Sequence, residues 1–205
     1  MWSKDRSIRL LGDSISELEV NYRFLKKSEI GVWMPKLPAT ATLNKARACS
    51  ALACRMYSRD LHNYLHSFAS LIDHMRKIVQ DIENTKLEAE YEEEKKKHAI
   101  VEVQVVKDLQ NFARHKYLPM AGQETGLFFA NVEQLKKNNP FKISFFPPSL
   151  LVEELLMDKK HFNTKTIQYL QEQGDGKLVL PSVMDKAHQA LMASSNCLYK
   201  KIIAL

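Results

Sequence analysis

The chain has neither glycine nor proline between Ala39 and Leu118, a gap of eighty residues in a protein of 205. These two residue types interrupt regular structure, and a strand averages only about five or six residues. A segment of this length without them therefore predicts helix. We divide the chain into an N-terminal amphipathic helix (1–30), a linker (31–42), a long coiled-coil-like helical segment (43–118) and a C-terminal helical region with loops broken by proline and glycine (119–205).

A repeating apolar pattern runs through the first half of the long segment. Eight residues follow one another in alternating steps of four and three, which is a heptad pattern. They are Tyr57, Leu61, Tyr64, Phe68, Leu71, Met75, Ile78 and Ile82, and we call them the seam. Three further apolar residues widen this face enough for two neighbouring helices in a bundle. We predict that the chain associates with itself or with another protein through the seam.

The N-terminal segment has the same spacing of apolar residues. From Ile8 to Leu25 they recur every three or four positions, which predicts an amphipathic helix over residues 4–28. Such a helix is marginal alone in water, so its apolar stripe needs a partner. We expect Gly31 to end this helix and to open the linker.

The segment from Glu90 to Val106 decides the overall shape, because it joins the seam to a second apolar stripe. Its Glu–Lys pairs at i, i+4 favour helix. With no glycine or proline to make a turn, we favour one continuous helix of about 75 residues and about 110 Å. The alternative is a helical hairpin that turns within 83–97, where Asn84 suits a turn, and packs 43–82 against 98–118.

The C-terminal region predicts shorter helices, which makes the fold class all-α. One helix is expected to start at Asn163, and another to span about 183–203, with Ser182 and Asp185 as a capping box. Helices over 149–158 and 164–172, with the GDGKLVLP segment (174–181) as a hairpin, would form a winged helix-turn-helix.

The residue patterns point away from an enzyme and predict no catalytic residue, cofactor or metal site. His62 and His66 have i, i+4 spacing, but Asn63 stands where a metalloprotease needs glutamate. Gly174-Asp175-Gly176-Lys177 lacks the remainder of a phosphate-loop motif and predicts a turn. The three cysteines have neither disulfide nor metal-site spacing, which favours the cytosol or nucleus.

Three classes of function fit this composition. The first is a non-enzymatic helical scaffold that assembles through its seam with protein partners, in a cytoskeletal or other multi-subunit assembly. The second is a BAR-like helical dimer on anionic membranes, suggested by the long central helix and by the first sixty residues, which hold eleven Lys and Arg against six Asp and Glu. The third is a nucleic-acid binder; it ranks last because its recognition helix would offer only Lys165 as a cation. No signal peptide or membrane-spanning run is expected.

Overall fold

The computed structural model describes residues 4–33, 43–118, 126–128, 142–144 and 147–205. In this part of the chain there are seven α-helices, one 3-10 helix and four strands of three residues each. The predicted all-α class is confirmed, with the two longest helices in the N-terminal half.

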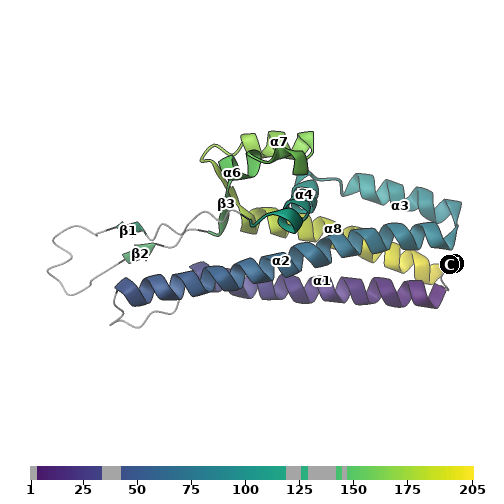
Figure 1. Ribbon diagram of the computed structural model, residues 1–205. Coiled ribbons are helices and arrows are strands. Elements are labelled where there is room, and N and C mark those ends of the chain that lie inside the picture. Colours follow the sequence, from purple (N-terminus) through teal and green to yellow (C-terminus); the bar gives the residue numbers. More distant parts are fainter. Residues whose placement is uncertain (1–3, 34–42, 119–125, 129–141, 145–146) are drawn as a thin grey trace.

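Three long helices form the body of the molecule. Helix α1 (Lys4–Trp33) and helix α2 (Leu43–Ile82) lie antiparallel, and helix α8 (Leu180–Ala204) lies beside both (Figure 1). The Lys4 ammonium bonds the Ile203 carbonyl oxygen at 3.2 Å, so the start of α1 meets the end of α8. This bundle buries the apolar stripes of all three helices in one core.

The first helix is longer than predicted. It continues through Gly31 to Trp33, so the expected stop at Gly31 is wrong. A glycine inside a helix costs only about 1 kcal/mol relative to alanine, and the packing of α1 along α2 and α8 outweighs that cost. The rest of the predicted linker, residues 34–42, lies outside the described residues.

The favoured continuous helix over 43–118 is also wrong. Helix α2 ends at Ile82, and Glu83 has a positive φ of 51°, which takes the chain out of the helical path. The side chain of Asn84 then caps helix α3 (Thr85–Lys97), its Oδ1 accepting the Lys86 and Leu87 amides, each at 3.0 Å. Helix α3 runs back along the bundle (Figure 1). The hairpin alternative, with Asn84 at the turn, describes this region better.

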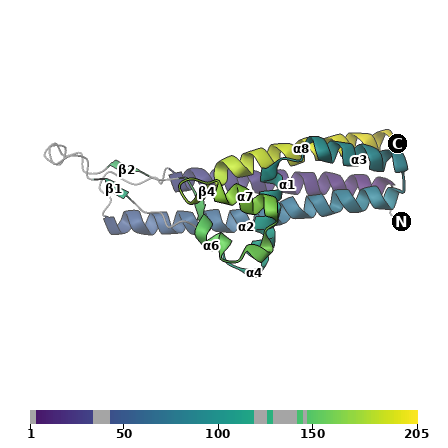
Figure 2. The same cartoon turned by 90° about the horizontal axis from the view of Figure 1, so that it is seen from above.

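A second break separates α3 from helix α4 (Val101–His115), which lies across the bundle (Figure 2). The charged run of residues 92–97 is helical, as predicted, but the helix ends with it. The break follows from burial, because α4 carries four core residues that a straight rod would leave in water. They are Val105, Val106, Leu109 and Phe112, each at most 4 % exposed.

A small C-terminal layer covers one side of α4. It consists of strand β3 (Ser149–Leu151), helix α6 (Val152–Leu156), a 3-10 helix (Lys159–His161), helix α7 (Thr164–Gln171) and strand β4 (Lys177–Val179). Asn163 caps α7 as predicted, its Oδ1 accepting the Thr166 amide at 2.9 Å. A separate pair, β1 (Gly126–Phe128) and β2 (Lys142–Ser144), is antiparallel.

Two predictions for this layer are wrong. The GDGKLVLP segment is no hairpin, because β4 pairs antiparallel with β3, Leu178 facing Leu150, and the chain then enters α8. The wing of a winged helix is therefore missing from this described segment. Ser182 does not cap α8 either, since the helix begins two residues earlier at Leu180.

Candidate functional site

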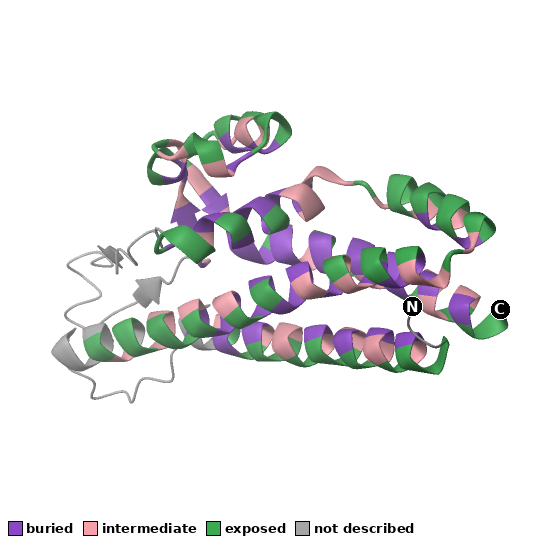
Figure 3. Cartoon of the chain, turned by 45° about the vertical axis from the view of Figure 1, so that its right-hand side comes forward, coloured by how far each residue is buried: buried purple, intermediate pink, exposed green. Residues whose placement is uncertain are grey.

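The seam lies inside the chain rather than on its surface. Figure 3 shows the buried residues of α2 facing the other helices of the bundle. Seven of the eight seam side chains are at most 2 % exposed, namely Tyr57, Leu61, Tyr64, Phe68, Leu71, Met75 and Ile78. Ile82, at the end of α2, is partly buried. Helices α1, α3, α4 and α8 all contact α2, so the neighbours foreseen for this face belong to the same chain.

A cluster of polar side chains joins α1 to α8 near the seam. The Tyr22 ring stacks on His188, with ring centres 3.7 Å apart and planes inclined by 6°. The Tyr22 hydroxyl donates to an Asp185 carboxylate oxygen at 2.9 Å, and Lys26 reaches the same oxygen at 3.2 Å. Asp185, which we expected in a capping box, therefore connects two helices. This cluster fixes α8 against α1.

The pKa shifts of Tyr22 and His188 are those of a buried polar contact that holds the fold together. Burial, and then the Asp185 carboxylate, raise the pKa of Tyr22 above its usual range, so its hydroxyl stays protonated. Burial lowers the pKa of His188, while Glu19, 3.5 Å from its Nε2, opposes that shift. His188 is 5 % exposed and thus barely accessible to a substrate.

The histidines singled out in the sequence lie on the outer side of α2. His62 is partly exposed and His66 is exposed. A third histidine, His74, contacts Ser14 of α1 with 2.7 Å between Nδ1 and Oγ, but the Ser14 hydroxyl also donates to the Leu10 carbonyl. Within the described ranges, no group of three or more histidine, cysteine, aspartate or glutamate residues could hold a metal ion. The three cysteines are free.

Exposed apolar side chains gather towards one end of the α1–α2 pair. Val20 and Phe24 are one turn apart on α1 and are 49 % and 53 % exposed. Leu52 and Met56 are one turn apart on α2 and are 56 % and 45 % exposed. Because residues at i and i+4 share a helix face, each pair makes a short apolar strip. We call these four residues the outer stripe.

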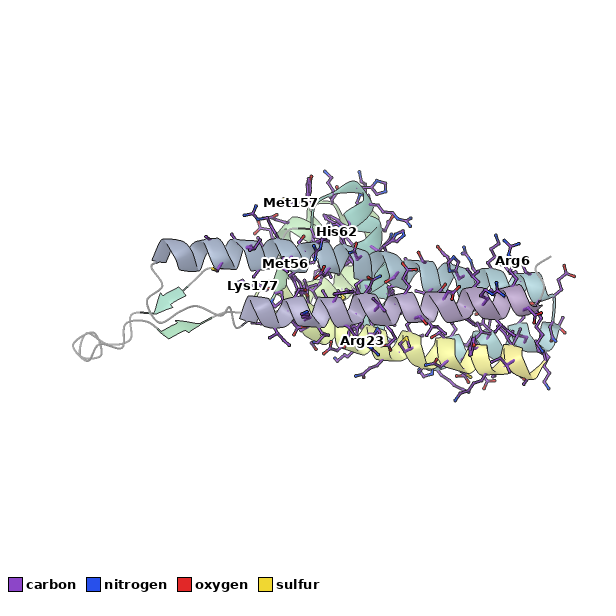
Figure 4. The ribbon with its side chains drawn as sticks, turned by 90° about the horizontal axis from the view of Figure 1, so that it is seen from below. Arg6, Arg23, Met56, His62, Met157 and Lys177 are labelled. Carbon is purple, nitrogen blue, oxygen red and sulfur yellow. The ribbon has the colours of Figure 1, made fainter. Side chains whose placement is uncertain are left out.

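The register of the helices explains why Leu52 and Met56, the α2 part of the outer stripe, are uncovered. Tyr22 meets Tyr64 and Ser14 meets His74, so Met56 lies level with the last turns of α1. The first turns of α2 extend beyond the start of α8 (Figure 1). Figure 4 labels Met56 on α2 and Met157, which is 75 % exposed, in the C-terminal layer. The seam pattern did not reveal the outer stripe, because scattered surface apolar residues are common in any helix.

Comparison of the chain with protein-family models, with curated proteins and with solved structures found no match. No described helix combines the length and the apolar character needed to cross a membrane.

Proposed function

We propose that this chain is a non-enzymatic helical scaffold that binds a partner protein along the outer stripe. We first assigned this role to the seam, but the chain's own helices cover it. Among the seam residues only Ile82 is partly exposed. The outer stripe is the observation that carries the proposal, since it presents apolar surface of the kind that the seam was expected to offer.

The partner that fits this surface is an amphipathic helix, supplied by another protein or by a second copy of the chain. The two strips follow one another along the antiparallel pair, because Tyr22, between Val20 and Phe24, meets Tyr64, whereas Met56 lies level with the last turns of α1. A helix with apolar residues at i, i+3, i+4 and i+7 can pack along these strips. In such a complex the side chains of the outer stripe would anchor the partner helix, which is the role that we first expected of the seam.

The BAR-like membrane alternative draws less support from the first third of the chain. Several of its cations are neutralised within the molecule: Arg23 pairs with Glu19, Lys26 with Glu29 and Asp185, and Arg59 with Asp60. These pairs reduce the charge available to an anionic surface. The nucleic-acid alternative still has only Lys165 as a cation on α7. We place the protein in the cytosol or nucleus, where free cysteines persist.

Sedimentation velocity over a range of protein concentrations tests self-association. Met56→Glu puts a charge into the outer stripe, and Met157→Glu makes the same change at a site that is also exposed but lies in the C-terminal layer. We expect any dimer to weaken with Met56→Glu and to persist with Met157→Glu. Both variants should keep the wild-type circular dichroism, because exposed substitutions change stability by about 0.5 kcal/mol or less.

Site-specific photo-crosslinking in cells tests a different protein as partner. A photoreactive phenylalanine analogue at position 56 should capture a discrete partner, and the same analogue at position 157 should not. A chain that remains monomeric and captures equally at both positions would refute the outer stripe as a binding surface. Binding to anionic vesicles that falls steeply with salt would support the membrane alternative instead.

A further inference from the structure

A pocket of about 690 Å³ opens where five helices meet, away from the outer stripe. Helices α2, α3, α4, α7 and α8 all contribute to its wall, and the break between α3 and α4 passes along it. Its volume is within the range of about 300–1,000 Å³ that is typical of small-molecule sites. The pocket is therefore large enough for a ligand of its own.

The floor of the pocket is apolar. Met75, Tyr91 and Leu191 line it, and each is at most 7 % exposed. Higher on the wall are partly buried aliphatic residues of the α3–α4 break and of α4, such as Val101 and Val103. A ligand that fills this space removes apolar surface from water at every level of the wall.

The rim of the pocket is positively charged. Lys95, Lys107 and Lys165 belong to the lining, which contains no aspartate or glutamate. Lys95 is paired with Glu92 of its own helix at 2.9 Å. Lys107 and Lys165 are exposed and have no ion-pair partner among the described residues. Two unpaired cations over an apolar cavity create a positive potential at its mouth.

Two helices also begin at this rim. The first turn of α4 and the first turn of α7 both contribute lining residues. Ile100, which precedes α4, makes no side-chain hydrogen bond to the first-turn amides. Glu102 in the first turn of α4 and Asp108, which accepts the Asn163 amide at 3.0 Å, offset the positive ends of these helix dipoles, so the rim charge rests on the lysines.

We propose that this pocket binds a linear amphiphile with a single carboxylate, its alkyl chain on the apolar floor and its carboxylate at the rim between Lys107 and Lys165. The apolar floor suits the alkyl chain of such a molecule, and the unpaired lysines at the rim suit its carboxylate. A neutral alcohol of the same length lacks the attraction to the lysines, and an alkylammonium is repelled by them. This proposal is independent of the outer stripe.

Calorimetric titration of the full chain with dodecanoate tests the proposal. Matched probes are dodecan-1-ol, kept below its solubility limit, and dodecylammonium, kept below its micelle concentration. We expect one dodecanoate per chain and affinity in the order dodecanoate, dodecanol, dodecylammonium. Val103→Trp, which fills the wall, should abolish binding, whereas Met157→Trp in the C-terminal layer should leave it unchanged. Circular dichroism of each variant verifies that it is folded.

A charge-neutralising pair tests the rim without altering the core. Lys107→Gln with Lys165→Gln should raise the dissociation constant for dodecanoate about fivefold, since each exposed ion pair contributes modestly. The same double change at Lys27 and Lys200, which are exposed on α1 and α8, should have no effect. The difference should shrink at high salt. Equal binding of dodecylammonium, or dodecanoate binding that neither the tryptophan nor the glutamine variants change, would overturn the proposal.

Discussion

Replacing Leu71 with alanine tests whether the seam belongs to the core of a single chain. Leu71 is 0 % exposed in the middle of α2 and belongs to the core shared with α1 and α8. Truncating a buried leucine costs about 2–5 kcal/mol, from the lost transfer free energy and from the cavity left behind. For a chain of this size, a loss of about 3 kcal/mol lowers the melting temperature by about 6–12 °C.

Thermal and urea unfolding, followed by circular dichroism, measures this loss. Lys96→Gln on the exposed face of α3 is the control and should change the free energy of unfolding by less than about 0.5 kcal/mol. The wild-type midpoint should not depend on protein concentration, since the seam is covered by the same chain. A midpoint that rises with concentration, together with a Leu71→Ala chain that dissociates while remaining helical, would refute the intramolecular core and restore the seam as an interface.

Three further changes follow from single residues. Tyr57→Phe should raise the free energy of unfolding by about 1 kcal/mol, because the Tyr57 hydroxyl is buried without a hydrogen-bond partner; a loss of stability in urea titration would mean that the hydroxyl is satisfied. Glu83→Gly should stabilise by about 0.5–1 kcal/mol, since glycine adopts the positive φ without the steric strain of a Cβ, and this gain exceeds its larger entropic cost; Glu83→Ala, which keeps a Cβ, should not. Burial lowers the pKa of His188 in the folded state, so unfolding free energy should be constant above about pH 6.5 and fall below it as the unfolded state takes up the proton first. His188→Gln should flatten that slope below about pH 6.5, and an unchanged slope would assign it to other groups.

The positions of the helices were largely predictable from the sequence. The spacing of the apolar residues identified α1 and α2, and the cap at Asn163 identified the start of α7. Seven of the eight seam residues are fully buried, so the pattern also identified which face of α2 enters a core. Asn84 was recognised as a residue suited to a turn, but the missing glycine outweighed it in our prediction. Glu83, with a positive φ, makes the turn for which we expected glycine or proline.

The candidate sites were less accessible to sequence reasoning. The pocket combines residues of five helices, from Ile72 on α2 to Ser194 on α8, and no local spacing connects them. The exposure of Leu52 and Met56 depends on where α8 begins relative to the end of α1, which is set by long-range contacts such as Tyr22 with Asp185. An apolar pair at i, i+4 in the sequence does not by itself show whether the folded chain buries or exposes it.

The sequence by itself determined that this chain is helical, where most of its helices lie and which stripe of each is apolar. Local propensity and a repeat of three to four residues are properties of a helix taken alone. Only the tertiary structure decided what covers those stripes. Burying the stripe of α4 requires the chain to reverse after Ile82, and the same reversal lets α4 and α8 join α1 in covering the seam from within one chain. An apolar stripe must be covered, but its periodicity does not specify the neighbour, because hydrophobic burial is non-directional.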